Sequence, residues 1–113
     1  MVSNGTDEKG LEYLYKAILT LETPEDVADF LDDICTVPEI KALTQRLQVA
    51  KMLYTNHVYT DIVSETGAST ATISRVNRTL NDGHNNEISG KGYRRILDRM
   101  GEQPGEEQRR GRR

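Results

Sequence analysis

Apolar residues recur every three or four positions along most of this chain, which is the spacing of one face of an α-helix. The pattern predicts a helix from about Lys9 to Leu21, a second that starts at Thr23-Pro24-Glu25-Asp26, and a third that Pro38 opens. Two short helices follow within residues 59–80, and a last one runs from about Lys91 to Met100. No strand-like alternation of apolar and polar positions accompanies these periods. We therefore expect an all-α protein of about six helices.

The segment from Tyr59 to Arg78 has the pattern of a helix-turn-helix. Gly67 is its ninth residue, where the tight turn between the two helices favours a residue that tolerates a positive φ. Ser69 suits the N-cap of the second helix and Thr60 that of the first, because a hydroxyl there accepts a free backbone N–H. Four apolar residues fall where the two helices would pack on each other: Ile62, Ala68, Ile73 and Val76.

The opposite side of the second helix is short, polar and basic. It carries Thr70, Thr72, Ser74, Arg75 and Arg78. Side chains of these kinds suit a helix that lies in the major groove of double-stranded DNA, where they can contact base edges. Helix-turn-helix units also serve as protein-contact modules, so the pattern is more specific for the local geometry than for DNA.

Length and composition limit the organisation of the chain. The 113 residues allow one domain, which we place at 9–100, between a flexible N-terminus at 1–8 and a disordered basic tail at 101–113. There is neither a run of about 20 apolar residues that would span a membrane nor the apolar core of a signal peptide. The single cysteine, Cys35, cannot form an internal disulfide, which fits the cytoplasm. The small aliphatic core would gain stability from burial against a second subunit.

The net charge of −3 conceals an uneven distribution. Residues 1–40 carry ten acids and two lysines, whereas residues 41–113 carry thirteen lysines or arginines and eight acids. The basic part contains the helix-turn-helix. Such an asymmetry is a hint of contact with nucleic acid, although solvated helix faces that differ in sign would produce it too.

Side chains that could catalyse a reaction or bind a metal are scattered. His57 and His84 are isolated, and neither lies at helical spacing from Cys35 or from a pair of carboxylates. The acidic residues between 25 and 33 are more typical of the solvated face of an amphipathic helix than of a cation site. We therefore expect no enzyme, no metal and no cofactor.

Two segments resemble the bacterial Trp repressor. Thr66-Gly-Ala-Ser-Thr-Ala-Thr-Ile-Ser-Arg75 is similar to its DNA-reading segment, and Pro38-Glu-Ile-Lys-Ala-Leu-Thr-Gln-Arg46 to the start of its long central helix. Within that superfamily the whole chain resembles the YerC/YecD group, over about residues 10–100. The resemblance implies a Trp-repressor-like helical bundle and an intertwined homodimer with a helix-turn-helix unit at each end.

The resemblance also implies which residues contact DNA. The positions that match the DNA-facing surface of the repressor are Ser69, Thr70, Ala71, Thr72, Ser74 and Arg75. Arg75 is the candidate reader of a base edge, because its guanidinium can pair with guanine in two hydrogen bonds. Arg78 and Lys91 are candidates for phosphate contacts, which position a protein without specifying sequence.

The co-repressor pocket is the part of the resemblance that this sequence follows least. The repressor holds its indole between two arginines over a glycine, with a serine nearby. The two arginines are matched by Arg46, through a shift of one residue, and by Arg75. Thr79 matches the serine, but Val76 replaces the glycine. Overpacking by the isopropyl group would cost about 1–3 kcal/mol. We therefore expect no response to tryptophan, and an effector that is a different small molecule or absent.

Two functions remain open on the sequence. The first is a sequence-specific regulator of transcription, a repressor, that binds double-stranded DNA as a homodimer in the cytoplasm. The second is a protein-interaction module that does not bind specific DNA. The exterior of residues 69–78 favours the first function, because it lacks the apolar or aromatic anchors expected in a protein-binding helix.

Overall fold

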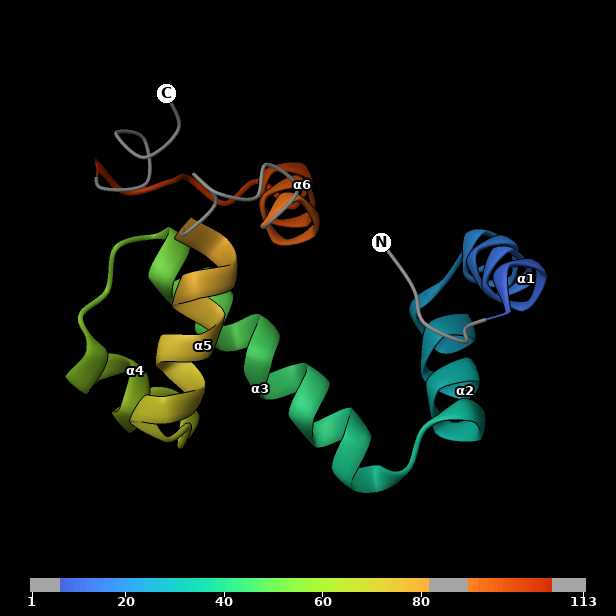
Figure 1. Ribbon diagram of the computed structural model, residues 1–113, viewed down its shortest axis with the longest axis horizontal. Coiled ribbons are helices and arrows are strands. Elements are labelled where there is room, and N and C mark those ends of the chain that lie inside the picture. The colour runs from blue at the N-terminus through green and yellow to red at the C-terminus, as the bar shows by residue number, and fades with distance from the viewer. Residues whose placement is uncertain (1–6, 82–89, 107–113) are drawn as a thin grey trace. The chain divides into compact units, whose positions relative to one another are not determined.

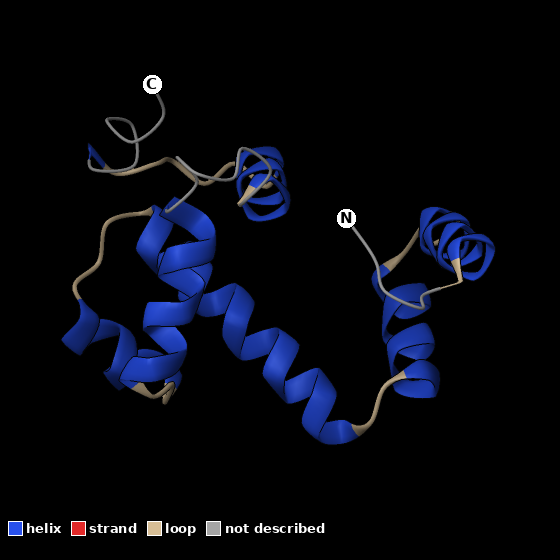
Figure 2. Ribbon diagram, in the orientation of Figure 1, coloured by secondary structure: helices blue, strands red, loops and turns tan. Residues whose placement is uncertain are grey.

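The computed structural model describes residues 7–81 and 90–106, where helices are joined by short turns and loops (Figures 1 and 2). No strand occurs within them, as the sequence predicted. The six helices are α1 (Glu8–Leu19), α2 (Pro24–Ile34), α3 (Val37–Tyr54), α4 (Tyr59–Thr66), α5 (Thr70–Asn81) and α6 (Lys91–Arg99). The loop expected after the second helix of the motif falls at 82–89 and lies, with His84, outside the described residues.

Helices α2 and α3 begin at reciprocal side-chain caps. Thr23 Oγ1 accepts the N–H of Asp26 at 3.0 Å, as the sequence predicted, and the Asp26 carboxylate accepts the N–H of Glu22 at 3.0 Å. Thr36 and Glu39 form the same kind of cap at the start of α3, with distances of 2.7 and 3.2 Å. The hydrogen bonds from the backbone of Glu22 and of Thr36 hold the pKa of Asp26 and that of Glu39 below their ordinary values.

The chain divides into two compact units, one up to Ile40 and the other from Lys41 onward. In the first unit, α1 and α2 are amphipathic but contain no buried residue. Leu19 and Tyr13 are 82% and 77% exposed, and Val27 and Ile34 are exposed as well. The apolar stripes predicted for these two helices therefore exist as faces that the first unit does not bury by itself.

The second unit contains a continuous hydrophobic core. It is formed by Val49, Ala50, Leu53, Tyr54, Ile62, Ala68, Ile73, Val76, Leu80 and Leu97, with Met52 and Tyr93 packed against it. Helix α5 packs on both α4 and α6. The four residues predicted to join the helices of the motif all belong to this core. Among the apolar residues of α6 and its C-cap, Leu97 is buried, whereas Ile96 and Met100 are largely exposed.

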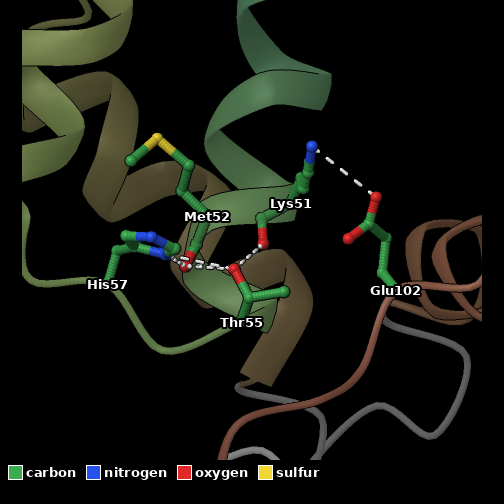
Figure 3. A network of polar contacts seen from close by, with 5 residues as sticks. All are labelled: Lys51, Met52, Thr55, His57 and Glu102. Atoms are coloured by element: carbon green, nitrogen blue, oxygen red, sulfur yellow. Dashed lines mark hydrogen bonds and ion pairs between the residues drawn. The ribbon is translucent and has the colours of Figure 1, made fainter.

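The segment after α6 returns to the C-terminal end of α3. Gly101, at φ 87°, ends α6, and the N–H of Gly105 then donates to the carbonyl oxygen of Tyr54 at 2.8 Å. Lys51 and Glu102 form an ion pair at 3.6 Å (Figure 3). Residues 102 and 105, at the start of the predicted basic tail, thus make contacts with residues distant in sequence. The arginine-rich end of the tail lies outside the described residues.

Candidate nucleic-acid interface

The turn between α4 and α5 has the geometry that the sequence predicted. Gly67 adopts the left-handed conformation, with φ 72° and ψ 6°, and its N–H donates to the carbonyl oxygen of Val63 at 2.9 Å. Thr66 Oγ1 donates to the carbonyl oxygen of Ile62 and accepts the N–H of Ala68. The turn is thus closed by local hydrogen bonds on both sides of the glycine, which fixes how the second helix leaves the first.

Helix α5 starts at the predicted cap, whereas α4 does not. Ser69 Oγ accepts the N–H of Thr72 at 3.1 Å and donates to Thr72 Oγ1 at 3.1 Å. Helix α4 begins at Tyr59, and its N-cap is Val58, which makes no side-chain cap hydrogen bond. The assignment of Thr60 as the cap is wrong, because the helix begins before that residue.

One stripe of α5 is exposed and basic. Ala71, Arg75 and Arg78 are all exposed and follow one another at intervals of four and three residues, so they lie on one side of the helix. Ile73, Val76 and Leu80 form the buried side. Ser69 and Thr70, at the start of α5, are exposed, and Thr72 and Ser74 are half-buried beside the basic stripe. The six positions that match the repressor's DNA-facing surface therefore gather at the N-terminal part of α5.

Lys91 lies apart from that group. It follows Gly90, where a Cβ would lie 2.7 and 2.8 Å from the carbonyl oxygens of Thr79 and Leu80, at the C-terminal end of α5. The 12 residues of α5 extend over about 17 Å, at about 1.5 Å per residue. Lys91 is exposed at the end of the helix that is distant from Ser69 and Thr70.

Val76 lies in the core, whereas the candidate pocket residues lie at exposed positions. Val76 is 3% exposed, so its isopropyl group occupies the volume that a glycine would leave open. Arg46, Arg75 and Thr79 are exposed residues of α3 and α5. A cavity of about 410 Å³ lies elsewhere, between α3 and α4, and those three residues do not line it. Its walls include Gln48, Lys51, His57, Asp61 and Glu65.

Two residues that connect the helix-turn-helix to the neighbouring helices were not predicted from the sequence. Gln45 of α3 donates from Nε2 to the carbonyl oxygen of Thr66, at the end of α4, at 3.2 Å. Arg94 of α6 donates to the carbonyl oxygen of Leu80, at the end of α5. Helical spacing could have indicated Arg94, because it stands three positions before the buried Leu97 and hence on the same side of α6.

His57 and Cys35 both lie beside helix ends. His57 Nδ1 lies 3.1 Å from Thr55 Oγ1 and 3.1 Å from the carbonyl oxygen of Met52, at the turn that leads into α4 (Figure 3). Cys35 is a free thiol, half-buried at the end of α2. Within 7–81 and 90–106, no three or more His, Cys, Asp or Glu residues come together as metal ligands would. Nor is any helix of these ranges both long and apolar enough to cross a membrane.

Known proteins with similar sequences and folds match nearly the whole described chain. Residues 9–100 match the family model of the Trp repressor protein. The uncharacterized protein YerC of Bacillus subtilis (strain 168) is 48% identical over 94 residues, which are 83% of this chain and 85% of YerC.

Two crystal structures have the same fold. A Trp repressor candidate from Staphylococcus aureus has 47% identity and a TM-score of 0.77, over 88% of this chain and 93% of the other. A TrpR-like protein from Eubacterium eligens ATCC 27750 has 46% identity and a TM-score of 0.76, over 88% and 96%. With the helix-turn-helix geometry described above, these matches show that the chain belongs to the Trp repressor family, as a protein of the YerC type.

Proposed function

We propose that this protein is a sequence-specific regulator of transcription, a repressor, that reads the DNA major groove with residues 69–80. The observation that carries the proposal is the exposed stripe of Ala71, Arg75 and Arg78 on α5, beside a turn closed at Gly67. The stripe has no large apolar side chain, so it is suited to phosphates and base edges rather than to a protein groove. Membership of a regulatory, non-enzymatic family supports the same function.

The residues in and beside α5 have different roles, which follow from their chemistry. Arg75 is the reader of a base edge, because a guanidinium can donate two parallel hydrogen bonds to guanine. Thr70, Ala71 and Thr72 offer methyl groups to thymine, and the hydroxyls of Ser69 and Ser74 bind directly or through water. Arg78 neutralises a phosphate. Lys91, at the far end of α5, binds a phosphate farther along the duplex and contributes affinity without sequence preference.

The regulator acts as a homodimer in the cytoplasm. The apolar faces of α1 and α2 support a dimer, because neither helix contains a buried residue. Leu43 and Leu47 of α3 are also more than a third exposed. Apolar surface of this extent on a small protein is typical of an interface, and a second copy offers the same faces. A twofold dimer places two α5 helices on half-sites about one helical turn of DNA apart.

Tryptophan is not the effector of this regulator. The packing of Val76 supports this view, because an indole at that position would have to displace core volume. Arg46, Arg75 and Thr79 remain candidates to contact a different small molecule. Such a ligand would lie beside Arg75, so that its binding would compete with or orient the reader of the base edge.

Selection of binding sites from random duplexes at several salt concentrations tests the proposal. We expect a twofold motif and a log affinity that falls with log salt by about 0.9 per phosphate neutralised. Arg75→Ala should cost about 1–3 kcal/mol per site and relax the preference at one base pair. Arg78→Ala is the matched control, since it should weaken all sequences equally and reduce the salt slope by about 1. No selected motif, together with salt-insensitive binding to a protein partner, would show an interaction module instead.

A further inference from the structure

The C-terminal end of α5 is capped by an arginine from another helix. The last carbonyl groups of a helix lack partners within the helix. Arg94 of α6 donates to the carbonyl oxygen of Leu80 from Nη2 at 2.7 Å and from Nε at 3.1 Å. Its Nη2 also donates to Oδ1 of Asn81 at 2.8 Å. The positive charge lies at the negative end of the helix dipole, where it is stabilising.

The same guanidinium contacts the scaffold. It lies over the ring of Tyr54, with its central carbon 5.9 Å from the ring centroid. Tyr54 belongs to α3, is 0% exposed, and its carbonyl oxygen accepts the N–H of Gly105 at 2.8 Å. One planar group therefore joins the end of α5 to a fixed point on α3. A lysine ammonium group has neither a planar face nor a rigid fork of donors, so it does not reproduce both contacts.

Little space separates α5 from the start of α6. A Cβ on Gly90 would lie 2.7 Å from the carbonyl oxygen of Thr79 and 2.8 Å from that of Leu80. The backbones are thus in contact at the point where Arg94 reaches across. This contact prevents the end of α5 from moving toward α6, and the Arg94 hydrogen bonds prevent it from moving away.

We propose that Arg94 is a positioning residue for DNA reading, which sets the direction of α5 relative to α3. The inference rests on the proposed function and identifies a control of specificity that makes no DNA contact. Because α5 is about 17 Å long, a tilt of about 10° about its C-terminal end moves its first residue by about 3 Å. A recognition site tolerates displacements of only about 0.5 Å. The cap at Leu80 therefore controls the positions of Thr70 and Arg75.

Affinity for the selected site and for unrelated DNA, measured across salt concentrations, tests this role. Arg94→Met and Arg94→Lys should each reduce the ratio of specific to non-specific affinity by roughly three- to thirtyfold, the range of such indirect coupling. The salt slope should stay that of the original protein, because Arg94 neutralises no phosphate. Arg95→Met is the matched control, since it removes the same charge from an exposed position of α6. Its ratio should not change.

Three results would contradict the inference. A reduced salt slope in Arg94→Met would identify Arg94 as a phosphate contact. Full specificity in Arg94→Lys would show that charge suffices without the planar group. An unchanged ratio in both Arg94 variants, at a protein concentration where each is folded, would show that the cap does not direct α5.

Hydrogen exchange without DNA separates this inference from the proposed function. The amides of the last turn of α5 should exchange roughly three- to thirtyfold faster in Arg94→Met than in Arg95→Met, while those around Gly67 keep their rates. Equal rates in the two variants would overturn the positioning role. If exchange changes as expected but no duplex is selected by the unaltered protein, the proposed function fails while the cap is supported.

Discussion

Two glycines in the same backbone conformation give a direct measure of how closely α6 approaches α5. Gly67 has φ 72° and Gly90 has φ 80°, so alanine is strained at both positions. Their surroundings differ. A Cβ on Gly67 meets no atom within 4 Å, whereas a Cβ on Gly90 meets two carbonyl oxygens at 2.7 and 2.8 Å. Gly67→Ala and Gly90→Ala therefore form a matched pair.

The backbone strain alone should lower the free energy of unfolding of Gly67→Ala by about 1–2 kcal/mol. In Gly90→Ala the same strain is present, and the overlap with backbone that has no rotamer to change adds about 1–3 kcal/mol. The gain from restricting the unfolded chain, which accompanies any glycine-to-alanine change, is common to the two variants. It cancels in their difference, so this difference reports the close approach.

Urea unfolding at one fixed protein concentration gives the comparison, because association of subunits would otherwise shift the midpoints. We expect Gly90→Ala to be the less stable variant by about 1–3 kcal/mol. Surface substitutions commonly change the free energy of unfolding by up to about 0.5 kcal/mol. If the free energies of unfolding of the two variants agree within this range, the close approach of α6 to α5 at Gly90 is refuted.

Three further predictions concern the caps and the core. Ser69→Ala should lower the free energy of unfolding by about 1 kcal/mol, because an N–H at the start of α5 loses its acceptor. Ser69→Asp should keep the free energy of unfolding of the original protein, because its carboxylate accepts the same N–H. Equal losses for the two variants in urea unfolding would contradict the cap. Val76→Gly should lower the free energy of unfolding by at least about 2 kcal/mol. Calorimetry of the unaltered protein with tryptophan should give no saturable heat. A saturable heat would show that the packing of Val76 admits the indole. Acid should destabilise the protein as the pH falls through the depressed pKa values of Asp26 and Glu39, because an ionised carboxylate accepts a cap hydrogen bond more strongly than a protonated carboxyl group does. The double variant Asp26→Asn, Glu39→Gln should show a shallower acid decline, and an unchanged decline would rule out this origin.

Features set by neighbouring residues could be predicted from the sequence. The left-handed Gly67 and the caps at Thr23 and Ser69 depend on contacts within about four residues, which a sequence pattern displays directly. The Thr60 cap failed because the start of a short helix can shift by two residues, here to an N-cap at Val58, without breaking the pattern of its apolar positions.

Contacts between distant residues could not be predicted in this way. Helical spacing places Arg94 on the same side of α6 as Leu97, but nothing local identifies Leu80 and Tyr54 as its partners. The segment 101–106 is polar and contains no strong helix signal, yet Gly105 and Glu102 bind to α3. Composition predicts whether an isolated segment would be ordered. It does not reveal the hydrogen bonds and ion pairs that the rest of the fold offers to that segment.

The cap on α5 has a consequence for how the protein is made. Helix α5 is synthesised before Arg94, which follows Leu80 by 14 residues, and before the segment that reaches Tyr54. A chain that has emerged from the ribosome only as far as Asn81 contains Ala71, Arg75 and Arg78, the stripe proposed to read DNA, but not Arg94, the residue proposed to position it. Because domains fold as units while synthesis proceeds from the N-terminus, a nascent or truncated chain would hold DNA loosely, through charge alone. Selectivity would then arise only once the C-terminal residues arrive.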